Sequence, residues 1–338
     1  MALRDPLLNV VIRQHTMPRF SVILPTHDRL DLLREAIASV LRQTFTDWEL
    51  IVVDDASKNP MDGCQLRQVG GPNASLLRLE SSRGGAGAKA AGAAAAGGEV
   101  LAFLDDDDLW DPTYLERADR ALREAPEVRV LFMGVRWFGE RARSGQEAQD
   151  RGMGIIRQQT GARRDANGLD RYSGDTLFAA LLERVPMPFQ RPVVYHEDYL
   201  TIGGYRPECL LWDCDWALRA VLHGECAQLD EGLYLQRASG QGYSSQGRRA
   251  LEHARSNLEI KESLLSHVAV DQRGLRPLVK RALHRDWKGY AWQLRQQEKW
   301  PECRKALRVA MKYGMSAELI KMLMQSWKQR LVPTGKRH

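Results

Sequence analysis

Short apolar runs alternate with helix-like segments in the first 125 residues, and this alternation limits the folds open to the chain. The runs FSVIL (20–24), ELIVV (49–53) and VLAFL (100–104) are short and almost wholly apolar, as buried parallel strands are. Between the first two, DLLREAIASVLRQTF (31–45) carries apolar residues at helical spacing. We therefore expect an α/β fold with a mostly parallel sheet flanked by helices. Such sheets bind ligands at the carboxyl ends of their strands.

Aspartates follow two of these strands. A pair (54–55) ends the second run, and four consecutive aspartates (105–108) end the third. On an extended backbone Asp105 and Asp107 would share one face, with Asp106 and Asp108 on the other. Converging carboxylates repel one another unless a cation joins them, and an all-oxygen ligand set suits Mg²⁺ or Mn²⁺. The alternative is an acidic turn that caps the next helix, which Asp111 as N-cap and Pro112 at the first helical position would begin.

Positive charge is concentrated at the end of the chain. From Ala250 onward there are 19 Lys and Arg against 8 Asp and Glu, whereas residues 1–249 have 30 against 35. A basic tail suits an anionic membrane surface or nucleic acid, and we favour the membrane because no nucleic-acid-binding motif is recognisable. The alternative is a solvated helical face.

The cysteines and the hydropathy pattern bear on the compartment. The five cysteines are scattered without a C-x-x-C pair, which argues against a disulfide framework and a zinc ribbon and favours a reducing cytoplasm. The sequence has neither a membrane-spanning apolar stretch nor a signal-peptide core. We expect a cytoplasmic protein, peripheral on the inner face of the membrane if the basic tail binds lipid.

Three segments in order carry a resemblance to a known family. SVILPTHDR (21–29), ELIVVDDAS (49–57) and GEVLAFLDDDDLWDP (98–112) resemble the nucleotide-sugar half of family 2 glycosyltransferases, which are inverting enzymes with the GT-A fold. The resemblance covers residues 18 to about 240. It implies a transferase that moves a sugar from a nucleotide-sugar, with UDP-sugars the first candidates, to a saccharide or lipid-linked acceptor in the synthesis of bacterial surface polysaccharides or glycoconjugates.

The resemblance also implies roles for residues of the donor half. Pro25, Thr26 and Asp55 would hold the nucleobase with Arg29 beside it, and Asp105 and Asp107 would bind Mn²⁺ or Mg²⁺ at the diphosphate with Asp106 close by. The Gly/Ala-rich stretch at 83–99 lacks the phosphate-loop patterns, so we expect a small-residue helix packed on the sheet. Lys89 falls where the family has the arginine of an A-R-N segment and would lie near the diphosphate, although Ala90 replaces the asparagine; the alternative is a surface lysine.

The acceptor half departs from the family pattern in two places. The family has G-G-F followed by E-D-x-D-x-x-x-R, and Gly204 and Asp213 match its second glycine and its catalytic base, while Trp212 replaces the glutamate. Gly204, Trp212 and Asp215 would border the acceptor, with Trp212 stacking on a sugar ring and Asp215 also suited to a supporting role. Asp213 and Asp215 would otherwise be ordinary helix-capping acids. A family histidine is missing from 234–244, where Arg237, Ser239 or backbone amides could bind phosphate instead.

These observations predict the organisation of the whole chain. We expect an extension (1–17), a GT-A domain (18–245) with a nucleotide-sugar half (18–135), a mobile loop (139–171) and an acceptor half (172–245), then a basic helical region (250–331). Two rival functions remain: a catalytically silent nucleotide-sugar-binding scaffold, against which Asp213 argues, and a sugar nucleotidyltransferase. The second would need a G-x-G-T-R-like loop where PTHDR stands.

Overall fold

The computed structural model describes residues 17–238 and 249–328, so Ser239 and the predicted extension up to residue 16 lie outside it. The strands are β1 (Phe20–Thr26), β2 (Trp48–Asp54), β3 (Ala74–Arg78), β4 (Val100–Phe103), β5 (Leu109–Trp110), β6 (Val130–Phe138), β7 (Arg163–Arg164), β8 (Leu169–Arg171), β9 (Pro192–Tyr195) and β10 (Cys226–Arg237). The helices are α1 (Leu30–Leu41), α2 (Gly63–Gly70), α3 (Gly84–Ala95), α4 (Tyr114–Glu124), α5 (Ala142–Thr160), α6 (Gly174–Leu181), the 3-10 helix η1 (Met187–Gln190), α7 (His196–Ile202), α8 (Trp212–His223), α9 (Ala250–Leu264), α10 (Val268–Gln272), α11 (Arg276–Gln296), α12 (Trp300–Tyr313) and α13 (Ala317–Lys328).

One mixed sheet organises the body of the protein, in the order β3-β2-β1-β4-β9-β6-β10-β8-β7 with β5 paired to β10. The first four of these strands are parallel. Strand β9 is antiparallel to both β4 and β6, so β6 and its parallel partner β10 point the same way as β4. The carboxyl ends of β1, β2, β4, β6 and β10 therefore meet at one edge of the sheet, as predicted for a mostly parallel α/β fold.

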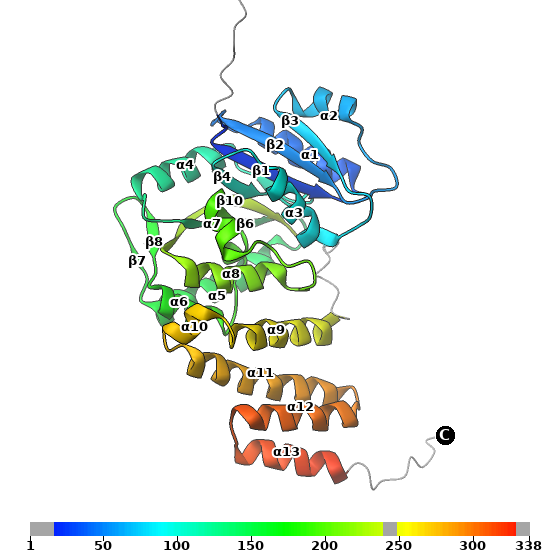
Figure 1. Ribbon diagram of the computed structural model, residues 1–338, viewed down its shortest axis with the longest axis vertical. Helices are drawn as coiled ribbons and strands as arrows, with labels where there is room; N and C mark the ends of the chain where they lie inside the picture. Colours follow the sequence, from blue (N-terminus) through cyan, green and yellow to red (C-terminus); the bar gives the residue numbers. More distant parts are fainter. Residues whose placement is uncertain (1–16, 239–248, 329–338) are drawn as a thin grey trace, which may run out of the picture.

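Helices cover both faces of the sheet (Figure 1). Alternate strand residues divide between two buried clusters: Ile23 and Val53 pack with the alanines of α3, whereas Val22 and Val52 pack with α1. This alternation follows from the two-residue period of a strand. The helix α3 sits close to the sheet because of Gly92, where a Cβ would lie only 2.5 Å from a methyl carbon of Ile23. The prediction of a small-residue helix at 83–99 is confirmed.

The C-terminal helices form a stack below the sheet in Figure 1, with α9 next to the body and α13 outermost. This region is helical, as predicted, but it is not a separate bundle, because Leu258 and Leu264 of α9 belong to the same buried cluster as Trp216 and Leu218 of α8. A buried ion pair between Lys261 and Asp286 joins α9 to α11. Within the described ranges, no helix combines the length and the apolarity needed to cross a bilayer.

The segment expected to be an irregular loop at 139–171 instead forms α5 and the β7–β8 hairpin. Few apolar residues of α5 face inward, and polar contacts hold the rest of it. Gln149 donates to the carbonyl of Val135 (2.7 Å) and accepts the indole N–H of Trp137 (2.8 Å). Gly145 allows α5 to lie against Trp137, since a Cβ there would approach the ring to 2.6 Å. The loop prediction is therefore wrong for residues 142–160.

The start of α4 also differs from the prediction. The helix begins at Tyr114, two residues after Pro112. Asp111 acts in the turn before it, where its carboxylate accepts the backbone N–H of Thr113 (3.1 Å) and the Thr113 hydroxyl (2.9 Å).

Candidate active site

The four aspartates lie in a turn directly after β4. The backbone N–H of Asp108 donates to the carbonyl of Asp105 (3.1 Å), so the chain is not extended here. Consequently the predicted pairing of alternate side chains is wrong. Asp106 and Asp107 share the guanidinium of Arg29 (3.2 and 3.1 Å). Asp105 and Asp108 face Arg191 (3.4 and 3.7 Å).

Each carboxylate of this acidic turn has its own set of partners. Asp105 pairs with Lys89 at 2.5 Å. Asp106 accepts the hydroxyl of Thr26 at 2.8 Å. Asp108 accepts the hydroxyl of Tyr234 (3.0 Å), the amide of Gln236 (3.1 Å) and the backbone N–H of Arg237 (2.8 Å). Three cations and several neutral donors thus offset the repulsion among four acids.

The acids differ in how readily they ionise. Burial alone would raise the pKa of Asp105, but the charges of Lys89 and Arg191 outweigh it and lower the pKa to about 2. Burial raises the pKa of Asp106 to about 6 in spite of Thr26 and Arg29. Burial, reinforced by the negative charge of Asp105, also raises the pKa of Asp107. Added positive charge would therefore stabilise the ionised forms of Asp106 and Asp107.

Two of the four carboxylates are suited to hold a divalent ion together with a substrate. The side chains of Asp105 and Asp107 are 26% and 25% exposed, whereas those of Asp106 and Asp108 are 8% and 0% exposed. Within residues 17–238 and 249–328, no cluster of three or more His, Cys, Asp or Glu side chains has the arrangement of a metal site. Two carboxylates are nevertheless enough for Mg²⁺ or Mn²⁺ when phosphate oxygens and water supply the other ligands. The residues present fit such an ion.

The predicted nucleobase residues lie at the ends of β1 and β2. Pro25 and Thr26 close β1, and the backbone N–H of Asp55 donates to the carbonyl of Thr26 (2.9 Å). The Asp55 carboxylate accepts the N–H groups of Arg83 (2.6 Å) and Gly84 (2.9 Å) and the hydroxyl of Ser82 (2.7 Å). Asp55 therefore fixes the first turn of α3, where the helix dipole favours a negative charge. It lies at the predicted edge, and its oxygens already have protein partners.

Lys89 is not a surface residue, because it is only 2% exposed. It projects from α3 toward the acidic turn, and its ammonium group also lies over the ring of Trp212, 4.7 Å from the centroid. Trp212 in turn meets Tyr205 edge to face at 4.6 Å. The side chain of Lys89 therefore connects the acidic turn with the start of α8.

Asp213 stands in the first turn of α8, directly after Trp212. Burial raises the pKa of its carboxyl group, while the positive charges of Arg191 and Lys89 act in the opposite direction. These interactions show that Asp213 and the acidic turn lie within one electrostatic neighbourhood. A carboxylate in this position can accept a proton from a ligand bound at the sheet edge.

The other two predicted acceptor residues support the turn before α8. The buried carboxylate of Asp215 bonds to Arg219 at 2.7 Å and to Arg206 at 3.4 Å. Arg219 also donates to the carbonyl of Gly204 (2.7 Å), which has a left-handed φ of 59°. With a side-chain exposure of 1%, Asp215 is buried against Arg206 and Arg219 and helps to hold the turn before α8.

Sequence reasoning missed Arg191, which stands just before β9. It is 6% exposed, stacks over the ring of Tyr234 at 4.7 Å and donates to the side chain of Gln236 at 2.6 Å. Its charge faces the acidic turn and Asp213 together. A single arginine before an apolar run carries no motif, so only the pairing of β9 between β4 and β6 reveals its place.

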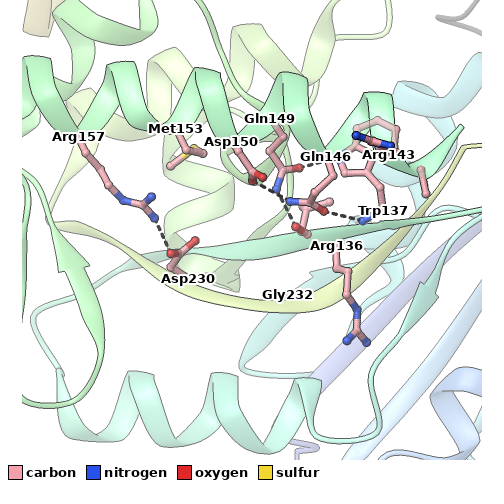
Figure 2. A pocket seen from close by; sticks show the side chains of 12 residues that line it. Arg136, Trp137, Arg143, Gln146, Gln149, Asp150, Met153, Arg157, Asp230 and Gly232 are labelled. Carbon is pink, nitrogen blue, oxygen red and sulfur yellow. Dashed lines mark hydrogen bonds and ion pairs between the residues drawn. The ribbon is translucent and has the colours of Figure 1, made fainter.

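A cavity of about 580 Å³ lies away from these residues, between α5 and the strands β6 and β10. Figure 2 shows Gln146 and Gln149 pointing from α5 toward the strand that carries Trp137, and Arg157 paired with Asp230. Its polar groups thus bond largely to one another, whereas the acidic turn keeps partly exposed carboxylates, so we place the chemistry at the turn.

Sequence comparison finds a family match for the first part of the sheet-bearing region. Residues 21–178 match the family model described as Glycosyl transferase family 2. The UDP-Glc:alpha-D-GlcNAc-diphosphoundecaprenol beta-1,3-glucosyltransferase WfgD of Escherichia coli is 35% identical over 96 residues, which are 28% of this chain and 38% of the relative. The putative teichuronic acid biosynthesis glycosyltransferase TuaG of Bacillus subtilis is 35% identical over 101 residues, which are 30% of this chain and 40% of the relative. The chain thus spans about two fifths of the length of these two curated relatives.

Solved structures extend the likeness over nearly the whole chain. Staphylococcus aureus TarS 1–349 in complex with UDP-GlcNAc aligns with a TM-score of 0.64 at 15% identity, covering 92% of this chain and 89% of that one. The Pyrobaculum calidifontis mannosyltransferase PcManGT, in complex with GDP-Man and Mn²⁺, gives 0.54 at 17% identity, covering 94% and 82%. These likenesses confirm the predicted GT-A fold. The family match itself is to residues 21–178, which resemble family 2 glycosyltransferases.

Proposed function

We propose that the chain is a metal-dependent inverting glycosyltransferase that moves a sugar from a nucleotide-sugar to a hydroxyl group. One observation carries the proposal: the candidate base Asp213 shares its surroundings with the acidic turn and with the two cations Lys89 and Arg191. A donor site and a base must meet in this way for a sugar to pass from a diphosphate to an acceptor.

The residues have distinct parts in the proposed reaction. Asp213 accepts the proton of the acceptor hydroxyl as its oxygen attacks the anomeric carbon from the face opposite the diphosphate, which inverts the configuration. A divalent ion bound by Asp105 and Asp107 would supply a Lewis acid for the leaving diphosphate. Lys89 adds positive charge on the same side. Thr26 and Arg29 hold Asp106 at the nucleotide end of the site.

The relatives suggest candidates for the donor and the acceptor. The name of WfgD includes UDP-Glc and a diphosphoundecaprenol acceptor, and the TarS complex holds UDP-GlcNAc. We therefore propose a UDP-sugar as donor and a saccharide or lipid-linked acceptor of surface-polysaccharide or glycoconjugate synthesis. Trp212 offers a partly exposed indole beside Asp213 as a platform for a sugar ring.

The proposed division of labour follows the sheet. Residues 18–135 carry the acidic turn and form the donor half, and residues 172–245 carry Asp213 and form the acceptor half. The helices from residue 250 onward bear the excess of Lys and Arg. We propose that this basic region holds the enzyme at the cytoplasmic face of a membrane that contains the acceptor.

The base is tested by Asp213→Asn, which keeps the shape of the side chain and removes its basicity. General-base catalysis contributes about 10²–10⁴ in rate, so turnover should fall by that factor while the Kd for the nucleotide-sugar stays within about twofold. UDP- and GDP-sugars are first screened by thermal shift with Mn²⁺, and the stabilising donor is then used to measure transfer and slow donor hydrolysis.

Asp175→Asn provides the matched control. Asp175 lies in the first turn of α6 and pairs with Arg273, and it belongs neither to the acidic turn nor to α8. Its replacement should leave turnover unchanged. Parental turnover in Asp213→Asn would rule out this residue as the base, and donor binding without transfer or hydrolysis in the parent would indicate a binding protein.

A further inference from the structure

Lys89 forms an ion pair with a carboxylate oxygen that a metal ion would need as a ligand. Its Nζ lies 2.5 Å from Oδ1 of Asp105, one of the two partly exposed acids of the turn. The Lys89 side chain is 3% exposed, so water contributes little to neutralising its charge. In this structure the ammonium group is therefore the nearest counter-cation of Asp105.

Arg191, the other cation that pairs with Asp105, is held differently. Arg191 donates to the carbonyl of Gln190 (3.1 Å) and to the side chain of Gln236 (2.6 Å), and it is farther from Asp105, at 3.4 Å. Its position is set by the ends of β9 and β10. Lys89 has a flexible four-carbon stem, and it contacts Asp105 and the ring of Trp212. Among these two cations, Lys89 is the one that can change partner.

We propose that Lys89 is an exchangeable counter-ion that makes metal binding conditional on the donor. Without donor, it neutralises Asp105 and opposes a divalent ion at the same oxygen. When the diphosphate arrives, its negative charge draws the ammonium group away from Asp105, and the carboxylate becomes free for the metal. The inference rests on the proposed function, because it requires the metal and the diphosphate to meet at the acidic turn.

Trp212 provides Lys89 with a second interaction partner. The indole lies under the ammonium group already, so Lys89 can leave Asp105 and keep a cation–π contact. Trp212 is also the residue before Asp213. The side chain of Lys89 thus contacts both the proposed metal ligand Asp105 and Trp212, the neighbour of the proposed base. The family pattern has an arginine at the position of Lys89 and a glutamate at the position of Trp212.

Thermodynamic linkage provides the test. If nucleotide increases the affinity for metal by some factor, metal increases the affinity for nucleotide by the same factor. We would measure the Kd of Mn²⁺ by calorimetry and by electron paramagnetic resonance, with and without saturating UDP, and repeat the set with GDP. In Lys89→Met, Mn²⁺ should bind the nucleotide-free protein about 10-fold more tightly than it binds the parent, within the usual range of such couplings.

The same variant should bind the nucleotide more weakly, because the cation that meets the diphosphate is gone. The factor by which nucleotide increases Mn²⁺ affinity should therefore shrink, while direct contact between metal and diphosphate keeps it above one. Opposite changes in the two affinities distinguish a counter-ion from a merely structural lysine, whose loss would weaken both. Lys89→Arg retains the charge and should resemble the parent, and Lys305→Met, at an exposed position of α12, controls for loss of a lysine.

The outcomes separate this inference from the proposed function. Equal or weaker Mn²⁺ binding in nucleotide-free Lys89→Met, with a normal circular dichroism spectrum, would overturn the counter-ion role and leave the metal site standing. The second measurement adds Asp107→Asn to Lys89→Met. Loss of Mn²⁺ binding in that double variant would support the site, and its retention would show that the ion binds elsewhere and overturn the metal-dependent function as well.

Discussion

The close packing of α3 on the sheet predicts that the same substitution has opposite effects at two glycines. At Gly92 a Cβ would lie 2.5 Å from Cγ2 of Ile23 and 2.9 Å from Cγ2 of Val53. Carbon atoms normally pack about 3.5–4.0 Å apart, so α3 must retreat by about 1 Å or the strands must yield. Both β-branched side chains are fully buried and restricted to few rotamers, so neither can rotate away to relieve the clash.

The magnitude follows from two opposing terms. Overpacking a core costs about 1–3 kcal/mol, and replacing glycine by alanine inside a helix returns about 1 kcal/mol. With two methyl groups in the way, Gly92→Ala should lower the free energy of unfolding by about 1–2 kcal/mol. Gly289 lies inside α11 with nothing within 4 Å of its would-be Cβ, so Gly289→Ala should raise the free energy by about 1 kcal/mol.

Urea unfolding followed by circular dichroism measures the difference, which should be about 2–3 kcal/mol between the two variants at an unchanged m-value. Lys89 precedes Gly92 on α3 by three residues, so a shift of the helix should also weaken Mn²⁺ binding in the presence of UDP in Gly92→Ala alone. Equal changes in stability at the two glycines would refute the packing argument.

Two further predictions concern charge. Burial raises the pKa of Asp106 to about 6 from an unfolded value of 3.8. Between these two pH values the native state therefore holds a proton that the unfolded state has lost. The stability that this proton contributes is present below about pH 4 and is lost as the pH rises through 6. The shift corresponds to about 3 kcal/mol, and Asp106→Asn in metal-free buffer should lose less unfolding free energy than the parent between pH 5 and pH 8; parallel curves would contradict the assignment. The basic helical region should bind anionic vesicles at low salt and release them at about 0.5 M salt, because basic residues near an anionic leaflet contribute about 1 kcal/mol each and salt screens them. Co-sedimentation with neutral vesicles is the control, and failure to sediment with anionic ones would exclude the proposed membrane contact.

Local pattern predicted the features that depend on chain direction and periodicity. The strand that ends in Pro25–Thr26 and the strands that precede Asp55 and the four aspartates lie where the apolar runs placed them. The common edge of their carboxyl ends follows from parallel pairing. Periodicity cannot predict a turn within a run of identical residues. The turn from Asp105 to Asp108 therefore escaped prediction, and with it the partners of the four acids.

Features held by long-range polar contacts escaped prediction. The helix α5 depends on Gln149 reaching the backbone and the indole of β6, and its glycines read as loop residues in the absence of that partner. Arg191 acquires its role only when β9 inserts between β4 and β6 and brings it to Asp105, from which it is separated by more than eighty residues. Residues such as Gln149 and Arg191 lie in no sequence motif, and their roles depend on partners that only the fold brings near.

The buried contact between α8 and α9 bears on how the chain can be engineered. Removing everything after residue 249 to obtain a minimal domain would take Leu258 and Leu264 out of the buried cluster that they share with α8, the helix that carries Asp213. It would also take away the Ser256 hydroxyl, which accepts the backbone N–H of Leu211 at the entrance to that helix. A shortened protein should therefore end after α9, with polar substitutions on the surface that α11 now covers.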